Sequence, residues 1–211
     1  MSAMVGVVME NRLHLMSDGG VFHARQPGVL IGVMPKVIPI PRLNAAFVAR
    51  GALVANLLFP MVCEAVRDFD ELIGDLGAIL DRFDTVMDEA VHMDNELLIG
   101  GWSEELGRPR LLFRAMHDGM AGVERGSVYE VAAFTTGDPA ALPSDLSTFR
   151  ASDGVGVLDR ARQMEIAGGT AIGGAIYHAE ITERGVSPVT CVHRWDDRIG
   201  EICGASVPAA A

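Results

Sequence analysis

Short hydrophobic runs alternate with polar turns at the start of the chain, as far as Gly51. Met4–Met9 and Leu13–Met16 are apolar runs short enough to be buried strands, and the polar residues between them suit a turn. Lys36–Ile40 and Asn44–Ala49 repeat this pattern further along the chain. Prolines within and beside the third run remove ladder hydrogen bonds, so we expect that run at a sheet edge or beside a cleft.

Two longer segments have the spacing of helices. Gly51–Val66 is apolar on nearly every side, and the proline at position 60 should kink the helix or remove a backbone hydrogen bond. Asp70–Met93 is amphipathic and carries its apolar residues along one stripe. Because few residues join these segments, we expect a helical hairpin that covers one layer of the fold.

The remaining sequence returns to strand-like runs with one helix between them. Strands are expected at Glu96–Trp102, Arg110–Met116, Ala121–Glu124, Ser127–Phe134, Ala175–Thr182 and Val189–Trp195. A helix is expected from Gly156 to Ile166. Strands, two helices, strands, a helix and strands are the order of an α+β protein. We predict a single domain over residues 1–204, followed by a flexible C-terminal tail at 205–211.

Composition and charge exclude several classes of protein. With 211 residues, 49% of them hydrophobic and 21% charged, the chain can form one globular domain with a substantial core. A net charge of −11, with no basic cluster, argues against a nucleic-acid surface. Since no basic and apolar leader begins the sequence, and no apolar run reaches about 18 residues, we predict a cytoplasmic protein without a membrane span. The 3 cysteines and 6 histidines lack metal-ligand spacing, and neither a metal nor an organic cofactor is expected.

The beginning of the chain carries a candidate nucleophile. Removal of Met1 would leave Ser2 with a free α-amino group, whose ordinary pKa of about 8 suits it to accept the hydroxyl proton. Asp18 ends the second strand run and Lys36 opens the third, so the two side chains can converge on that hydroxyl. From the residues alone, each of the three also has a simpler interpretation. Ser2 is a common second residue, Asp18 can be a turn aspartate before two glycines, and Lys36 can be a solvated lysine between prolines.

The same stretch resembles a known family. SAMVGVVMENRLHLMSDGG resembles the opening of proteasome-type β subunits, including the bacterial HslV peptidase, where a threonine, a strand hairpin and an acid follow one another. KVIPIPRLNAAFVARGA is similar to the family's lysine, strand pair and turn into the first helix, and ELLIGGWSEELGRPRLLFRAMHDG is similar to its later paired strands. The resemblance implies an N-terminal nucleophile (Ntn) hydrolase fold: a four-layer αββα sandwich of two antiparallel sheets between helix layers.

The resemblance also implies roles for six residues. They are Ser2 as nucleophile, Asp18 and Lys36 as its electrostatic support, the backbone N–H of Arg50 as oxyanion donor, and Thr136 and Glu165 as weaker matches to two residues that support the amine. Three positions depart from the family pattern. The nucleophile is serine instead of threonine, a glycine at position 20 replaces an arginine, and arginine replaces glycine at the oxyanion position.

The function implied by the resemblance is hydrolysis of an amide or peptide bond by Ser2 after Met1 is removed. The alternative is a catalytically inactive, proteasome-like structural or assembly protein that retains Met1, and the three departures favour it. We expect a homo-oligomer in either case, with a ring as one arrangement, because the first helix is apolar around nearly its whole circumference. The substrate would be a peptide or another amide, and an unfoldase partner stays open.

Overall fold

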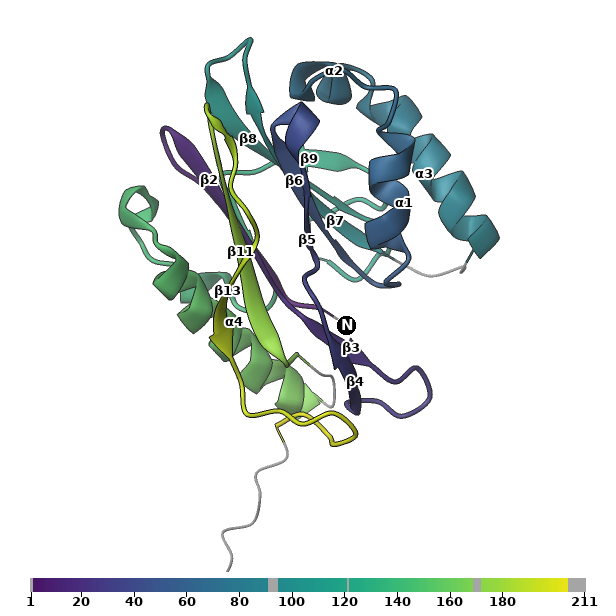
Figure 1. Cartoon of the computed structure of the whole chain (residues 1–211), viewed down its shortest axis with the longest axis vertical. Coiled ribbons are helices and arrows are strands. Elements are labelled where there is room, and N and C mark those ends of the chain that lie inside the picture. Colours follow the sequence, from purple (N-terminus) through teal and green to yellow (C-terminus); the bar gives the residue numbers. More distant parts are fainter. Residues whose placement is uncertain (1, 91–94, 121, 169–171, 205–211) are drawn as a thin grey trace, which may run out of the picture.

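The computed structural model describes residues 2–90, 95–120, 122–168 and 172–204. Two antiparallel sheets pack face to face, and helices cover the outer side of each (Figure 1). The expected α+β architecture, a four-layer αββα sandwich, is therefore confirmed. The tail expected at 205–211 lies outside the described residues, and the single domain over 1–204 stays a prediction.

The first sheet brings the start of the chain beside the end of its second strand. Its order is β10 (Ala133–Thr135), β1 (Met4–Val8), β2 (Arg12–Asp18), β11 (Ala175–Thr182) and β12 (Gly185–Val186), and β13 (Thr190–Arg194) also pairs with β11. In the antiparallel register, Met4 pairs with Ser17, and Asp18 pairs with Ile176 on the other side. Residues that precede Met4 therefore lie next to Asp18.

The second sheet contains the strands that flank the helical segment. Its order is β5 (Val37–Ile40), β6 (Ala45–Arg50), β7 (Glu96–Ser103), β8 (Arg108–Ala115) and β9 (Val128–Glu130), with β5 at an edge as its prolines require. A separate two-stranded sheet consists of β3 (Gly20–Phe22) and β4 (Leu30–Val33). It follows directly on β2, so it extends beyond the main sheet where the chain begins (Figure 1).

The helices differ from the expected ones in their limits. α1 (Ala55–Val62) is shorter than the helix expected over Gly51–Val66. The helix expected over Asp70–Met93 is two helices, α2 (Phe69–Gly74) and α3 (Leu76–Ala90), and its last residues, 91–94, lie outside the described part. The break falls at a glycine followed by an aspartate, two residues with low helix propensity.

One helix covers the first sheet, and short 3₁₀ turns join other elements. α4 (Ala151–Gly168) is longer than the helix expected over Gly156–Ile166, because the Asp153 carboxylate accepts the backbone N–H of Arg150 at its start. The 3₁₀ turns are η1 (Pro41–Leu43), η2 (Pro139–Ala141) and η3 (Leu146–Thr148).

The expected strand over Ser127–Phe134 crosses between the two sheets. Val128–Glu130 pairs with β8 in the second sheet, whereas Ala133–Thr135 pairs with β1 in the first. The two residues between them bond to both sheets, through Val131 N–H to Leu111 C=O and Val8 N–H to Ala132 C=O. The strand expected over Ala121–Glu124 is wrong, because residues 122–124 form no strand; residue 121 lies outside the described part.

Three hydrophobic clusters fill the spaces between the four layers. The cluster between the two sheets includes Met4, Leu13, Leu15, Leu98, Leu111 and Phe113, and the clusters under the helices include Val5, Val7, Leu158 and Ile176 on one side and Phe47, Phe59, Leu72 and Phe83 on the other. Alternate residues of β1 thus face different layers. Gly6 faces the second sheet, where an added Cβ would lie 2.7 Å from a Leu111 methyl carbon, so a larger residue would push the sheets apart.

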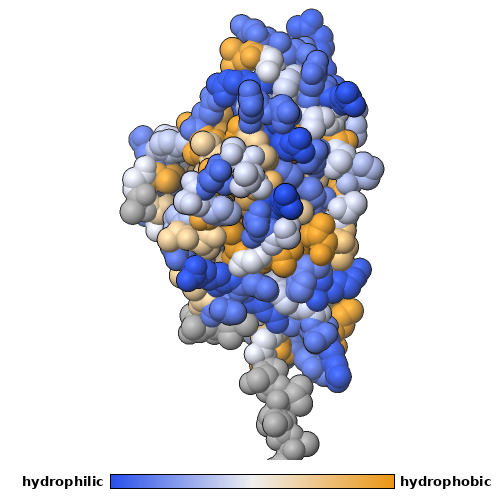
Figure 2. Space-filling view, turned by 90° about the vertical axis from the view of Figure 1, so that its left-hand side faces the viewer, coloured by the Kyte–Doolittle hydropathy of each residue, from blue (hydrophilic) through white to orange (hydrophobic). Residues whose placement is uncertain are grey.

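Hydrophobic residues on the face drawn in Figure 2 lie in small groups between hydrophilic ones. Such scattered apolar side chains are normal on a protein surface. Among the described residues, no helix is both long and apolar enough to cross a membrane.

Candidate active site

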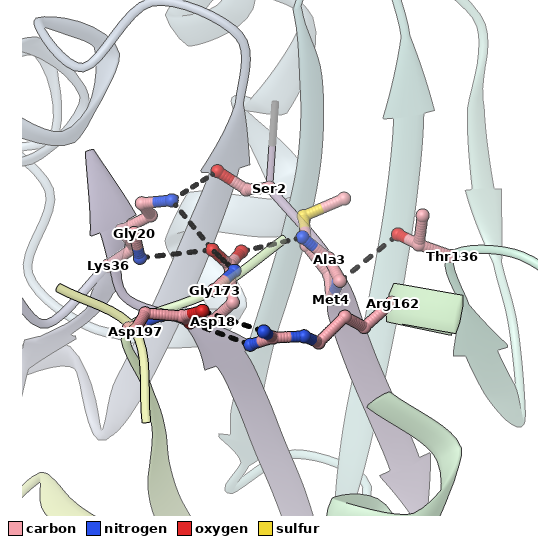
Figure 3. A network of polar contacts seen from close by, with 11 residues as sticks. Ser2, Ala3, Met4, Asp18, Gly20, Lys36, Thr136, Arg162, Gly173 and Asp197 are labelled. Atoms are coloured by element: carbon pink, nitrogen blue, oxygen red, sulfur yellow. Dashed lines mark hydrogen bonds and ion pairs between the residues drawn. The ribbon is translucent and has the colours of Figure 1, made fainter. Parts of the chain in front are cut away.

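The side chain of Lys36 joins Ser2 to Asp18 at one end of the sheets (Figure 3). Lys36 Nζ donates to Ser2 Oγ at 2.8 Å and lies 3.3 Å from Asp18 Oδ2. Asp18 and Lys36 therefore form an ion pair beside the Ser2 hydroxyl. All three side chains are buried, with 4% of Ser2, 0% of Asp18 and 4% of Lys36 exposed.

Backbone donors hold the Asp18 carboxylate in place. Oδ1 accepts the N–H of Ala3 at 2.7 Å, and Oδ2 accepts the N–H groups of Gly20 at 3.0 Å and Gly173 at 3.4 Å. Hydrogen bonds from backbone N–H groups to a carboxylate are strong, so three of them fix the position of this side chain. The bond from Ala3 fixes the residue next to Ser2, so Asp18 orients both the lysine and the start of the chain.

Burial changes the protonation behaviour of Lys36. Removal from water lowers the pKa of its ammonium group, and the nearby Asp18 carboxylate offsets part of that effect. A lowered pKa makes the ammonium group a better proton donor than an exposed lysine. Lys36 Nζ can therefore exchange a proton with the Ser2 hydroxyl as well as stabilise negative charge on it.

The local sequence explains why these groups meet. Lys36 directly precedes β5, the edge strand of the second sheet. After Asp18 the chain passes through Gly19 into β3, which begins at Gly20, and neither glycine leaves room for a side chain. A Cβ at Gly19 would lie 2.7 Å from the Met34 carbonyl oxygen, and one at Gly20 would lie 2.9 Å from the Gly173 carbonyl oxygen. Glycine at position 20, where the family has arginine, is thus required by close backbone packing.

A small cavity of about 120 Å³ opens beside Ser2. It is lined by Ser2, Gly20, Val21, Phe22, Lys36, Ala49, Gly51, Leu53 and Asn56. The Oδ1 atom of Asn56, a residue that is 4% exposed, has no hydrogen-bond partner within the described part of the chain. A substrate group in this cavity would meet Ser2 on one wall and Asn56 on another.

Arg50 ends β6 beside this cavity. Ala49 and Gly51, its neighbours on either side, line the cavity, and Gly51 has a positive φ of 124° that turns the chain toward α1. The Arg50 guanidinium instead pairs with Glu96, at 3.1 Å between Nη1 and Oε1. Backbone amides at this turn therefore lie close to Ser2, while the arginine side chain is held by β7.

The two weaker candidates have different positions. Thr136 anchors the start of β1: its Oγ1 accepts the N–H of Met4 at 3.1 Å, and its own N–H donates to the Met4 carbonyl at 2.9 Å (Figure 3). Thr136 thus contacts the residue two places after Ser2. Glu165 belongs to α4, but its side chain lies outside the described part.

Two further groups support the site, and neither was assigned from the sequence. Gly173 donates to Asp18, and Gly174 donates to Asp197 Oδ2 at 2.8 Å. Arg162 holds Asp197 through two bonds of 2.7 Å each. The glycine run after α4 was the available signal, because closely packed backbone needs residues without a side chain.

Two antiparallel sheets between helix layers, with the beginning of the chain at one end of the sheets, are the architecture of Ntn hydrolases. The structure of the Gly-1 mutant of Anbu from Hyphomicrobium sp. strain MC1 is similar to this chain, with a TM-score of 0.66 and 13% sequence identity. The similarity covers 94% of this chain and 89% of that one. Anbu has a proteasome-like Ntn hydrolase fold, and the likeness shows that this chain shares it. No protein-family model and no curated protein matches the sequence.

Proposed function

We propose that the protein hydrolyses amide bonds, with peptides as the substrate class, and that Ser2 is its nucleophile once Met1 is removed. The observation that carries the proposal is the 2.8 Å contact between Lys36 Nζ and Ser2 Oγ inside a buried site. Burial of a lysine and a carboxylate lowers the stability of a fold, and clusters of buried charged groups are often found at catalytic sites. The buried lysine beside a hydroxyl and a carboxylate therefore supports a catalytic role.

The proposed reaction has two stages. In the first, Ser2 Oγ bonds to the substrate carbonyl carbon as its proton passes to the Ser2 α-amine or to Lys36 Nζ. The carbonyl electron pair moves onto oxygen, and its return breaks the C–N bond while the departing amine takes the proton. In the second stage, water attacks the resulting ester with the same base accepting its proton, which releases a carboxylic acid and restores Ser2.

Backbone N–H groups are the proposed donors to the oxyanion. The donor implied by the resemblance is the N–H of Arg50, and the lining of the cavity adds the N–H of Gly51 as a second candidate. Asp18 is proposed to hold Lys36 and the start of β1 in position. Thr136 is proposed to fix the same segment through Met4, and Glu165 stays a prediction.

The size of the cavity suggests which side chain precedes the cleaved bond. A space of about 120 Å³ lined by Val21, Phe22 and Leu53 favours a small side chain over an aromatic one. We therefore propose that peptides with alanine or serine at this position react faster than peptides with phenylalanine.

Fluorogenic peptides test the proposed function. Protein with Ser2 at its N-terminus should release the fluorophore, Ser2→Thr should retain turnover, and Ser2→Ala and Lys36→Ala should reduce it at least about a hundredfold. Circular dichroism should show that each variant is folded. If Ser2→Ala cleaves as fast as the unmodified protein, the nucleophile is wrong. No turnover on any peptide, with Ser2 demonstrably free, would favour the inactive assembly protein.

We also propose that the chain forms a homo-oligomer. Leu57 and Met61 on α1 are each 66% exposed, and Leu53, one turn earlier, is 39% exposed. Residues spaced by four lie on one face of a helix, so Leu57 and Met61 form an apolar stripe on α1, and Leu53 lies in the turn that precedes the helix. A second copy of the chain is the proposed partner for this stripe.

A further inference from the structure

A second and larger cavity of about 470 Å³ lies where the chain crosses from β9 to β10. Its apolar walls include Phe113, Met120, Val123, Tyr129, Phe134 and Leu142. Of the described residues, none lines both this cavity and the one beside Ser2. The volume is within the range of about 300–1,000 Å³ that is typical of small-molecule sites. It is therefore a separate space with room for a ligand.

One wall of this cavity carries three polar side chains that meet at a single oxygen. Arg50 Nη1 lies 3.1 Å from Glu96 Oε1, and His117 Nε2 lies 2.8 Å from the same atom. The second carboxylate oxygen, Oε2, has no hydrogen-bond partner within the described residues, although Glu96 is only 4% exposed. A buried acceptor without a donor is unusual in a folded protein and asks for an explanation.

The charges around Glu96 indicate which kind of donor would suit it. The Arg50 guanidinium already compensates the carboxylate, so a second cation would add an uncompensated buried charge. A neutral N–H or O–H group adds a hydrogen bond without that penalty. The last bond of a glutamate side chain has a broad torsional preference, so a small rotation can bring Oε2 toward the cavity.

We propose that this cavity binds a flat, apolar molecule with a neutral N–H or O–H donor, and that the donor bonds to Glu96 Oε2. The rings of Phe113 and Phe134 are stacked on each other, with their centroids 4.2 Å apart. Together with the ring of Tyr129, this pair provides aromatic surface for a planar group. The site is distinct from the cavity beside Ser2, and it uses the side chain of Arg50, whereas the proposed hydrolysis uses only the backbone N–H of that residue.

Isothermal titration calorimetry with indole tests this site, because indole is a planar molecule with one N–H donor and no strong acceptor. 1-Methylindole has the same apolar body without the donor. Indole should bind at least about tenfold more tightly, as expected for a hydrogen bond to a charged group. This comparison needs no variant, so a folding defect cannot obscure it.

Two variants locate the binding. In Glu96→Gln, the amide oxygen can keep the bonds to Arg50 and His117. The NH₂ group then replaces Oε2, so a donor stands where the ligand needs an acceptor. Indole should then lose its advantage over 1-methylindole. Ala133→Trp should fill the cavity and abolish binding of both molecules. Equal binding of both molecules to the unmodified protein, tighter binding of benzoate than of indole, or no binding at all would each overturn the proposal, and none of these results depends on turnover at Ser2.

Discussion

Lys36 Nζ lies 2.8 Å from Ser2 Oγ, although the two residues are 34 positions apart in the sequence. Neither residue belongs to a regular strand: Ser2 precedes β1 and Lys36 precedes β5. Their contact therefore depends on how the two sheets are placed on each other. Asp18 completes the arrangement from the end of β2 and links the first sheet to the lysine.

The Asp18–Lys36 pair should contribute to stability as a unit. Lys36→Met and Asp18→Asn should each lower the free energy of unfolding by about 3 kcal/mol, because each leaves a buried charge without its partner. The double variant should be less destabilised than the sum, with a coupling energy of about 1–3 kcal/mol. Urea unfolding of the four proteins measures this. Strictly additive effects would mean that the pair is not coupled in solution.

Gly19→Ala should destabilise the fold and disturb the site together. The added Cβ would lie 2.5 Å from the Tyr177 ring and 2.7 Å from the Met34 carbonyl oxygen, so the chain after Asp18 must shift. We expect a loss of about 1–3 kcal/mol in urea unfolding. Gly77→Ala in α3 is the matched control, since nothing lies within 4 Å of its added Cβ, and it should be neutral or slightly stabilising. Equal stability of the two variants would contradict the close packing at Gly19.

One buried and one partly buried histidine should make the fold sensitive to acid. His14 Nδ1 lies 2.9 Å from His178 Nε2, and burial, followed by the neighbouring His14, lowers the pKa of His178 from 6.5 to about 4. Between these pH values the unfolded chain binds a proton at His178 and the folded chain does not. Stability should therefore be complete above about pH 6.5 and fall by about 3 kcal/mol as the pH drops to about 4.

A variant at His178 separates this effect from other acid-sensitive groups. His178→Gln cannot take up the proton, so its free energy of unfolding should fall less steeply over the same pH range. The free energies of unfolding of the two proteins are compared at each pH. Glu180 and Arg12, which lie beside the pair, are present in both proteins, so the difference between the curves reports on His178. Parallel curves would show that His178 does not titrate differently on folding.

The apolar stripe on α1 should control assembly. At micromolar concentration, sedimentation of the unmodified protein should show a species several times heavier than the 22.5 kDa chain. Replacement of the two most exposed apolar residues, in Leu57→Lys with Met61→Lys, should shift it toward the monomer. The matched control is Leu106→Lys, at an exposed position in a turn on another part of the fold. A monomeric unmodified protein would contradict the proposed interface.

The sequence predicted the beginning of the chain well because its signals are local. The apolar runs around Glu10–Arg12 fix a hairpin, and a hairpin places Asp18 opposite the residues before Met4 whatever the rest of the fold does. The position of Lys36 required more, namely the packing of one sheet on the other. That information came from the family resemblance and could not come from periodicity.

The prediction from the sequence was wrong where one apolar run contributes strands to both sheets. Ser127–Phe134 has the composition of a single strand, and the change of sheet at Val131 leaves no local mark in the sequence. The same crossing lines the larger cavity. Glu96 and His117, which meet in its wall, are 21 positions apart in the sequence and form no recognisable motif. Likewise, Gly173 reaches Asp18 only through the packing of the segment after α4.

The central claim is that Ser2 is a nucleophile activated by its neighbours. Its most direct test is covalent labelling with a β-lactone, read as intact mass and then by peptide mapping. Two forms of the protein are compared, one that begins at Ser2 and one that retains Met1. We predict a single adduct on Ser2 in the first form, no adduct in the second, and none in Lys36→Ala. An unlabelled Ser2-terminal form, or equal labelling of the form that retains Met1, would contradict the claim.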